Sequence, residues 1–315
     1  MVQAVVATGY GGPENLSVVD VDVPEPVAGQ VRVEVRAGGV NPIDHKLYGG
    51  GYGEDPARLP MRLGFEAAGV VTGVGDDAQG PAGPVRVGDE VIAYPIDGGY
   101  AEAVTVPASS VFPKPAEMSF EQAAGLSLTG VTAYHLVEAT GVRAGDTVLV
   151  HAASGGVGLI AAQLAVERDA TVIGTASERH HDRLRGYGVI PVEYGDGLAD
   201  RVRDLAPGGV DVALDTVGTD EAVDVSLAMV ADRRRIATIA AFDRAPEAGI
   251  QLLGSGPGAD PGDNIRSRGR LVLTDLVRRG TLRVEVAQSF PLAEAAEAHR
   301  LVSGGHAGGK VVLLP

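Results

Sequence analysis

The chain contains no cysteine and no tryptophan among its 315 residues, and aromatic residues make up only 4% of it. The absence of cysteine excludes disulfides, thiolate zinc sites and cysteine nucleophiles. The scarcity of aromatic side chains argues against stacking platforms for nucleic-acid bases. No apolar run approaches the roughly 18 residues of a membrane span, and the N-terminus lacks the basic and apolar regions of a signal peptide. We therefore expect a cytoplasmic protein with no membrane partner.

Lysine is also scarce, occurring only as Lys46, Lys114 and Lys310, so arginine carries the positive charge, and the formal net charge is −15 at pH 7. A chain this acidic is not expected to bind nucleic acid. With 315 residues, of which 45% are hydrophobic, the chain is long enough for two domains with sizeable cores.

Residues 147–158, with the sequence TVLVHAASGGVG, form the most informative stretch of the chain. A β-branched run precedes small residues and glycines, and an apolar helical pattern follows, which predicts a strand, a tight turn and a helix. The spacing is Ala153-x-Gly155-x-x-Gly158, so alanine replaces the first glycine of the dinucleotide-binding fingerprint. A second apolar run at 170–174 completes a βαβ unit of about 30 residues.

This context predicts a pyrophosphate site at the helix N-terminus, although an ordinary tight turn also contains glycines. The expected contacts are Ala153, Ser154, Gly155, Gly156 and Val157.

The end of the second strand bears on which dinucleotide binds. NAD-preferring sites place Asp or Glu there to bind the ribose 2′-hydroxyl. Here the strand ends in neutral residues, and Glu178-Arg179-His180-His181 follow. Hydroxyl and cationic donors suit a 2′-phosphate, so we expect NADPH, with Ser177 and Arg179 as contacts. Glu178 would take the acidic role if the turn were one residue longer, and the basic residues also suit a solvated helix start.

The first 115 residues predict short strands broken by turn signals, as in a β-barrel or a sandwich. These strands are expected at 2–7, 16–23, 31–37, 67–74, 90–93 and 101–106. From Ser119, which forms a plausible capping box with Gln122, helices and strands alternate as in a doubly wound parallel sheet. The strands of this part are expected at 147–151, 171–175, 189–192, 210–215 and 235–239.

The C-terminal part begins with a Gly/Pro/Asp-rich stretch at 254–263, which is typical of a mobile loop or lid. We expect a helix at 266–279, a strand at 283–286, a helix at 292–303 and a strand at 310–314. The last strand follows the nucleotide-binding domain, so it is free to pair with the N-terminal strands. The expected fold class is α/β, with a discontinuous β-rich domain at 1–118 and 264–315 and a Rossmann domain at 119–263.

Over essentially its whole length the chain resembles the medium-chain dehydrogenase/reductases, specifically their zinc-independent quinone oxidoreductase branch. The resemblance is carried by segments 39–44, 63–69, 87–91, 98–102, 130–134, 152–158, 215–218 and 308–313. It implies a GroES-like catalytic domain joined to a Rossmann domain, NADPH as cofactor, and a homodimer or homotetramer. Residues 243–270, which normally shape the substrate pocket and the subunit contact in the family, depart from its pattern.

The zinc-dependent branch of this family holds its catalytic zinc with Cys, His and Cys. The matching positions here are Asn41, Phe65 and Leu128, and phenylalanine and leucine cannot bind zinc. The cysteines of the structural zinc lobe are missing as well. We therefore expect no metal, which excludes chemistry on a zinc-bound alkoxide.

Without a metal, hydride transfer requires orientation and a hydrogen-bond donor near the developing oxyanion. In the family, the residues that match Asn41 and a nearby tyrosine line the substrate end of the cleft, so we expect Asn41, Asp44 and Tyr48 to be catalytic. Tyr48 would donate to the acceptor oxygen, and Asn41 would hold the acceptor or the nicotinamide. The structural alternatives are a turn at Asn41-Pro42, a helix cap for Asp44 and core packing for Tyr48.

The resemblance implies further cofactor contacts. Thr132 matches a threonine near the nicotinamide, or else it bonds back to the preceding helical turn. Tyr194 matches a tyrosine at the adenosine phosphate, Val217 follows a strand on the cofactor side, and Phe242 is expected beside the nicotinamide and substrate. Lys310 is either a cofactor or substrate contact or a protecting charge on an edge strand.

Together these expectations describe an NADPH-dependent oxidoreductase that transfers hydride to a quinone. The same chemistry suits the β-carbon of an α,β-unsaturated ketone or aldehyde, and the sequence does not separate these small-molecule acceptors. A non-catalytic, crystallin-like NADPH-binding protein is the alternative from another class, because a fold does not determine a function.

Overall fold

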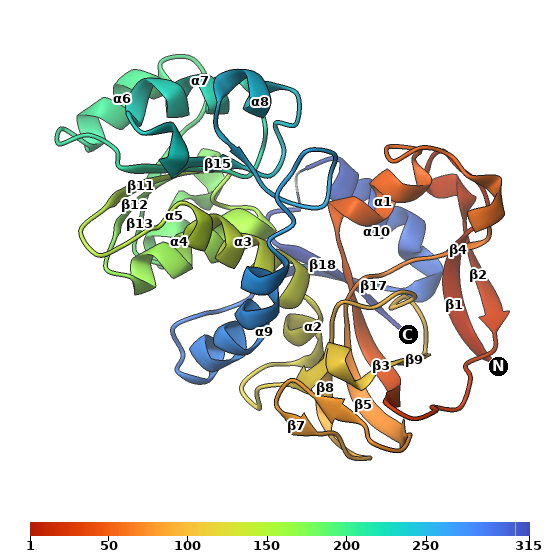
Figure 1. Cartoon of the computed structure of the whole chain (residues 1–315). Helices are drawn as coiled ribbons and strands as arrows, with labels where there is room; N and C mark the ends of the chain where they lie inside the picture. Colours follow the sequence, from red (N-terminus) through yellow and green to blue (C-terminus); the bar gives the residue numbers. More distant parts are fainter. Residues whose placement is uncertain (306) are drawn as a thin grey trace. The chain divides into compact units, whose positions relative to one another are not determined.

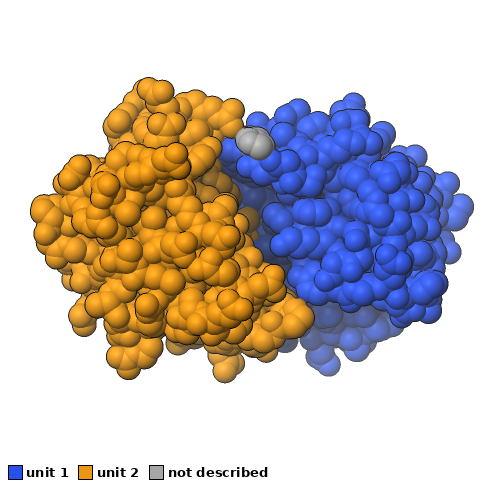
Figure 2. Space-filling view, turned by 90° about the horizontal axis from the view of Figure 1, so that it is seen from above, with its two compact units in different colours: residues 1–128, 284–315 blue, residues 129–283 orange. Residues whose placement is uncertain are grey.

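The computed structural model describes residues 1–305 and 307–315 and divides into two compact units (Figure 1, Figure 2). Unit 1 comprises residues 1–128 and 284–315, and unit 2 comprises residues 129–283. The boundaries between the units in the chain therefore follow residues 128 and 283, whereas the sequence predicted domain boundaries after residues 118 and 263. Among the described residues, the helices are all too short or too polar to cross a lipid bilayer.

Unit 1 is built on a seven-stranded sheet in the order β10-β8-β5-β3-β18-β17, with β9 paired to β3 as well. Its strands are β3 (Gln30–Val40), β5 (Ala67–Val74), β8 (Glu90–Ala93), β9 (Ala103–Pro107), β10 (Val111–Pro113), β17 (Val286–Pro291) and β18 (Lys310–Leu314). The C-terminal strand β18 lies between β3 and β17, so the last residues of the chain complete a sheet begun by the first hundred.

Two smaller sheets complete the β structure of unit 1 in the order β2-β1-β4 and as the pair β6-β7. Their strands are β1 (Val2–Ala7), β2 (Leu16–Val21), β4 (Met61–Arg62), β6 (Gln79–Gly80) and β7 (Gly83–Pro84). The helices of this unit are α1 (Pro42–Tyr48), α2 (Phe120–Ala124) and α10 (Ala295–Ser303). The capping box of Ser119 and Gln122 at the start of α2 is confirmed.

Unit 2 contains a six-stranded parallel sheet in the order β13-β12-β11-β14-β15-β16. Its strands are β11 (Thr147–His151), β12 (Thr171–Thr175), β13 (Val189–Val192), β14 (Val212–Asp215), β15 (Ile236–Thr238) and β16 (Gln251–Leu252). The order reverses between β11 and β14, which is the topological switch point at which doubly wound sheets bind ligands.

Helices cover the parallel sheet on both sides, with α4 and α5 on one side and α6, α7 and α8 on the other (Figure 1). The helices are α3 (Ser127–Ala139), α4 (Gly156–Glu167), α5 (His181–Arg185), α6 (Leu198–Leu205), α7 (Asp220–Met229), α8 (Arg244–Ala248) and α9 (Asp263–Arg278). The strands β14 and β15 are buried at every residue and β11 at every residue after Thr147, which explains their continuous apolar runs.

The expected strands of both units appear with ends shifted by at most three residues, except the one at 283–286. That prediction is wrong, because the strand in this region is β17 at Val286–Pro291. The Gln163 side chain binds both main-chain groups of Arg283, with Arg283 N–H donating at 2.9 Å and Gln163 Nε2 donating to the Arg283 oxygen at 3.0 Å. These groups are consequently not available to a sheet.

Candidate functional site

The turn predicted to bind the pyrophosphate lies at the switch point of unit 2. β11 ends at His151, and α4 begins at Gly156 with Gly155 as its N-cap. The first N–H groups of an α-helix have no partner within the helix, and they carry the positive end of its dipole. Residues 154–157 are partly exposed, so this helix end is accessible to an anion. The geometry fits a pyrophosphate group.

Close backbone approach explains the small residues around the turn. A Cβ atom at Gly158 would lie 2.3 Å from the Ala152 carbonyl oxygen, so the third position of the motif requires glycine. Ala153 takes the first position, and its methyl group is buried against Gly174 of β12, where a Cβ atom would lie 2.6 Å from it. The neighbouring strand therefore supplies the space that the first glycine of the motif usually provides.

Thr175, at the end of β12, fixes the beginning of the turn. Its Oγ1 accepts from the Ala152 N–H at 2.9 Å, and its carbonyl oxygen accepts from the Ala153 N–H at 2.9 Å. Ala152 has a φ of 55°, a left-handed conformation that a non-glycine residue adopts only under local constraint. These two hydrogen bonds supply that constraint.

The segment after β12 presents the residues predicted to bind the 2′-phosphate. Ser177 is half-buried and precedes a short 3₁₀ turn, whereas Glu178 and Arg179 are exposed on that turn. Arg179 Nε donates to His180 Nε2 at 3.2 Å. Burial lowers the pKa of His180, and the positive charges of Arg183 and Arg179 lower it further. The strand end is thus neutral and basic groups surround it.

At the end of β14, the Asp215 carboxylate accepts hydrogen bonds from the loop that follows it and from Thr238. Asp215 Oδ1 accepts from the N–H groups of Val217 and Gly218, each at 2.9 Å, and Oδ2 accepts from Thr238 Oγ1 at 2.7 Å. Val217 is left 44% exposed beyond the strand. His151, at the end of β11, is buried against Ser226, and burial lowers its pKa to about 4. The hydrogen bonds of Asp215 therefore fix the conformation of this loop, and the apolar side chain of Val217 is exposed on it.

The predicted cofactor contacts of unit 2 follow five consecutive strands of one parallel sheet. The turn follows β11, Ser177 follows β12, Tyr194 follows β13, Val217 follows β14 and Phe242 follows β15. Because the strands are parallel, all these residues lie at the carboxyl edge of the sheet. Tyr194 is 56% exposed, and Phe242 packs partly buried against Gly256. Thr132 is instead a buried residue of α3.

Unit 1 contains a buried ion pair between Glu66 and Lys310. Glu66 Oε1 and Lys310 Nζ are 3.0 Å apart, and the two residues are 0% and 4% exposed. Glu66 Oε1 also accepts from Asn41 Nδ2 at 3.0 Å, and Oε2 accepts from the Leu128 N–H at 2.8 Å. One carboxylate therefore ties together the end of β3, the start of α3 and the last strand.

The expected roles of Lys310 are not supported by this geometry. An ammonium group has three donors, and those of Lys310 reach Val40 O at 3.1 Å, Asn41 Oδ1 at 2.6 Å and Glu66 Oε1 at 3.0 Å. All three partners belong to unit 1, so no donor remains for a cofactor. Lys310 also lies on β18, which is an interior strand, so it does not protect a sheet edge.

Both side-chain N–H donors of Asn41 are likewise engaged within unit 1. Its Nδ2 donates to Gly39 O at 3.1 Å and to Glu66 Oε1, while its Oδ1 accepts from Lys310. An amide has two N–H donors, and both are used here. The expectation was that Asn41 holds the acceptor or the nicotinamide, and no side-chain N–H of Asn41 remains to donate to either.

Asp44 lies in the first turn of α1 and accepts three hydrogen bonds inside the protein. The donors are the Asn41 N–H at 2.8 Å, Tyr100 Oη at 2.8 Å and the Gly64 N–H at 3.3 Å. Burial raises the pKa of Asp44 from 3.8 to about 7, and the hydrogen bonds from Tyr100 and Asn41 oppose that rise. The N-cap of α1 is Asn41, and Asp44 at the third helical position completes the capping box by accepting from the Asn41 N–H. Asp44 therefore stabilises the helix start, but not as the N-cap residue that its structural alternative supposed.

Tyr48 is buried in the apolar core of unit 1 and is 1% exposed. A hydrogen bond of 2.9 Å joins its Oη to Nδ1 of His299 on α10. Burial lowers the pKa of His299 to about 4, so the imidazole is neutral at pH 7. Burial also raises the pKa of Tyr48. A hydroxyl in this position does not reach an acceptor molecule, so the predicted donor role of Tyr48 is not supported.

Sequence reasoning missed Glu66, Tyr100 and His299, which bind the predicted residues of unit 1. It also missed Arg183, whose Nη2 donates to the carbonyl oxygen of Ser154. Glu66 has a local signal, because it is the single charged residue in the apolar run 63–71. Arg183 belongs to a basic segment but has no motif of its own. His299 has no signal at all, because its partner Tyr48 lies 251 residues away in the chain.

The positions that match the zinc ligands of related enzymes do not fit a zinc ion. Asn41 Oδ1 already accepts from an ammonium group, and the side chains of Phe65 and Leu128 have no ligand atom. Within residues 1–305 and 307–315, no three His, Asp or Glu side chains gather closely enough to hold a metal.

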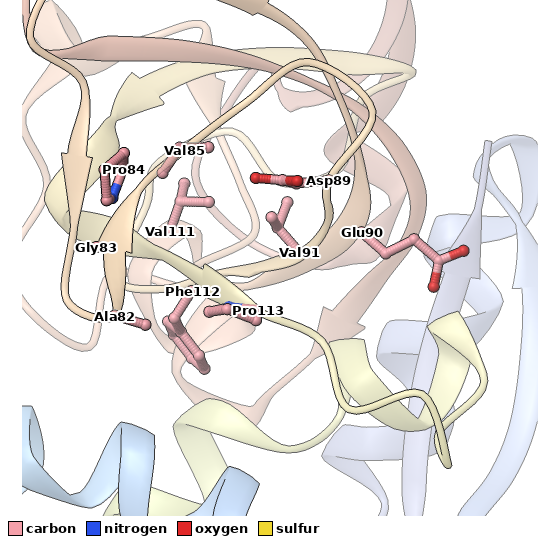
Figure 3. A pocket seen from close by; sticks show the side chains of 10 residues that line it. All are labelled: Ala82, Gly83, Pro84, Val85, Asp89, Glu90, Val91, Val111, Phe112 and Pro113. Atoms are coloured by element: carbon pink, nitrogen blue, oxygen red, sulfur yellow. The ribbon is translucent and has the colours of Figure 1, made fainter.

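Two surface pockets lie away from the predicted site residues. One, of about 170 Å³, lies in unit 1 beside β7, β8 and β10, and Figure 3 shows the side chains that line it. The other, of about 470 Å³, lies in unit 2 near Gln163, Tyr187 and Thr281. None of the predicted site residues lines either pocket.

Comparison with known proteins identifies relatives over the full chain. A model of the alcohol dehydrogenase GroES-like domain matches residues 27–116, and a model described as zinc-binding dehydrogenase matches residues 189–313. The chain is 36% identical to a quinone oxidoreductase of Pseudomonas aeruginosa, with 100% of both chains covered. It is 35% identical to a 2-haloacrylate reductase of a Burkholderia species, which covers 100% of this chain and 99% of the relative.

A solved structure leads to the same group. The crystal structure of Escherichia coli quinone oxidoreductase complexed with NADPH has a TM-score of 0.85 and 28% identity, covering 99% of this chain and 100% of that one. The GroES-like unit, the Rossmann order of the parallel sheet and these full-length likenesses agree. The chain therefore belongs to the quinone oxidoreductase family of the medium-chain dehydrogenase/reductases.

Proposed function

We propose that the protein is an NADPH-dependent oxidoreductase that transfers hydride to a quinone without a metal ion. The observation that carries this proposal is the carboxyl edge of the parallel sheet. It combines an accessible helix N-terminus with a neutral strand end followed by basic groups. The E. coli relative, whose structure holds NADPH, supports the choice of cofactor.

The chain's own residues bind and orient the cofactor. The N–H groups at the start of α4 hold the pyrophosphate, while Ser177, Arg179 and Tyr194 surround the adenosine and its 2′-phosphate. Thr132, Val217 and Phe242 border the ribose and nicotinamide. When bound, NADPH supplies a hydride, and a quinone that takes up this hydride and one proton from water becomes a hydroquinone.

We propose a positioning role for the three residues of unit 1 first expected to be catalytic. Asn41, Asp44 and Tyr48 are buried and bonded to Lys310, Tyr100 and His299, respectively. They stabilise the join between β3 and α1 and do not touch the acceptor. Catalysis then depends on the proximity and orientation of two bound molecules.

The decisive experiment follows the loss of nicotinamide absorbance when the protein is mixed with NADPH or NADH. The acceptors are 1,4-benzoquinone, 9,10-phenanthrenequinone and a simple enone. We expect oxidation of NADPH with a quinone and little oxidation of NADH. Binding of NADPH without turnover of any acceptor would favour the non-catalytic alternative.

A second candidate function is reduction of an electron-poor carbon–carbon double bond conjugated to a carbonyl or carboxylate. The full-length likeness to a 2-haloacrylate reductase favours it. Adding 2-chloroacrylate and an enone to the same assay separates the candidates. Faster turnover of either than of both quinones would replace the quinone as the proposed acceptor.

We also propose that the chain assembles as a homodimer or homotetramer, as its family resemblance implies. Size-exclusion chromatography with light scattering measures the mass directly. A mass equal to the 32.2 kDa of one chain at micromolar concentration would contradict this proposal. The cytoplasmic location stays a prediction from the sequence.

A further inference from the structure

Arg183 connects the phosphate-binding turn to the basic segment that follows β12. It lies in the middle of α5, and its Nη2 donates to the carbonyl oxygen of Ser154 at 2.8 Å. Ser154 is itself part of the turn, two residues before α4 begins. A single side chain therefore links the two structural elements that bind the two ends of an adenosine diphosphate in this fold.

Further basic groups lie on the same side of the sheet edge. His180 feels the charges of both Arg183 and Arg179, and Arg179 Nε donates to its ring at 3.2 Å. Two guanidinium groups thus flank one imidazole next to Ser177. This is the place in the Rossmann fold where the second strand ends and the adenosine ribose binds.

The chemistry of arginine suits a double role at this position. A hydrogen bond to a neutral carbonyl orients the guanidinium but does not cancel its positive charge. The planar group presents its N–H donors in a fixed fork, so a phosphate oxygen approaches a cation that is already oriented. Arg183 is half-buried, whereas Arg179 is exposed, so the field of Arg183 is less screened by water.

We propose that Arg183 is a specificity-determining residue for the cofactor. It holds the turn through Ser154 and places its charge beside the 2′-phosphate of NADPH, which NADH lacks. This inference deepens the proposed function and rests on it. It adds a residue of α5 to the contacts Ser177 and Arg179, which were expected from the strand end alone.

The test measures dissociation constants for NADPH and NADH from nicotinamide fluorescence. The proteins are the wild type, Arg183→Gln, Arg183→Lys and the control Arg185→Gln. Arg185 lies on the same helix and has the same charge as Arg183, but it is exposed and pairs with Asp182 instead of binding the turn.

Loss of a charge-assisted contact predicts that Arg183→Gln weakens NADPH about tenfold or more and NADH no more than about threefold. Arg183→Lys keeps the charge but loses the fork, so its preference for NADPH lies between those of the wild type and Arg183→Gln. Arg185→Gln leaves both affinities unchanged. Displacement by adenosine 2′-monophosphate weakens in Arg183→Gln, whereas displacement by adenosine 5′-monophosphate does not.

The outcomes separate the inference from the proposed function. Equal weakening of NADPH and NADH would reduce Arg183 to a support of the turn, and no change in either would remove it from the site. If Arg183→Gln does not fold, as judged by circular dichroism, an unchanged NADPH preference in Arg183→Lys overturns the inference. A wild type that binds neither nucleotide contradicts the proposed function itself.

Discussion

The carboxyl edge of the parallel sheet in unit 2 and the ion-pair cluster of unit 1 use polar groups in different ways. At the sheet edge, main-chain N–H groups and half-exposed side chains remain accessible to a ligand. In the cluster, Glu66, Lys310 and Asn41 satisfy one another in the interior. A polar residue near a family motif is therefore a ligand contact only when its hydrogen-bonding capacity is not already used by the fold. Four experiments test this difference.

Breaking the ion pair has the largest expected effect. Lys310→Met leaves the Glu66 carboxylate buried without its cation, which lowers the free energy of unfolding by about 3–5 kcal/mol. Chemical denaturation measures this loss. The double variant Glu66→Gln/Lys310→Met recovers part of it, because no buried charge is left unpaired. If the folded single variant lost NADPH affinity but no stability, Lys310 would be a ligand contact after all.

The second largest expected effect is the pH dependence of stability that arises from the titration of Asp44. Its pKa is raised to about 7, so the folded protein holds this proton more tightly than the unfolded chain does. The resulting stability is complete below about pH 4 and is lost as the pH rises through 7, at no more than about 1.4 kcal/mol per pH unit.

Unfolding free energies of the wild type and Asp44→Asn between pH 4 and 8 measure this contribution. We expect the wild type to lose stability relative to the variant as the pH rises. His299, with its pKa lowered to about 4, gives the opposite dependence, but it is present in both proteins and cancels. A difference that does not change with pH would contradict the burial of an ionisable Asp44.

A larger residue in the turn after β11 tests the carboxyl edge of the parallel sheet in unit 2. Gly158→Ala places a Cβ atom where it meets the Ala152 oxygen at 2.3 Å, so the turn must shift. We expect a cost of roughly 1–3 kcal/mol, seen as at least about fivefold weaker NADPH binding. Gly208→Ala is the matched control, because its Cβ meets open space. Equal NADPH affinity in the two variants would remove the turn from the site.

Removing the Tyr48 hydroxyl has the smallest expected effect. Tyr48→Phe deletes one buried hydrogen bond to His299 and lowers the free energy of unfolding by about 1 kcal/mol. We expect kcat with a quinone to stay close to that of the wild type. A large fall in kcat at unchanged stability would restore the hydroxyl as a donor to the acceptor.

Much of the fold could be predicted from the sequence because its signals are local. The parallel strands appear as buried β-branched runs, and the turn appears as glycines required by close approach at Gly158. The two-residue strands β4, β6, β7 and β16 have no such signal, because pairing with a partner strand defines them. The misplaced strand at 283–286 fails for a similar reason, since Gln163 takes the main-chain groups of Arg283.

The residues of the candidate site also differ in whether their signals in the sequence are local. The residues after β11 to β15 could be predicted because a parallel sheet brings all its strand ends to one edge. The roles of Asn41 and Tyr48 could not, because their partners Lys310 and His299 lie 269 and 251 residues away in the chain. No local pattern reports whether a distant side chain already occupies a donor.

The position of β18 also sets an order of events during synthesis on the ribosome. Glu66 and the pairing edge of β3 emerge early, whereas their partners Lys310 and β18 emerge only after the whole of unit 2. Unit 2 is one continuous segment, so it is able to fold while the nascent unit 1 still lacks a strand and the cation for its buried carboxylate. Unit 1 is completed only when β18 and Lys310 have left the exit tunnel.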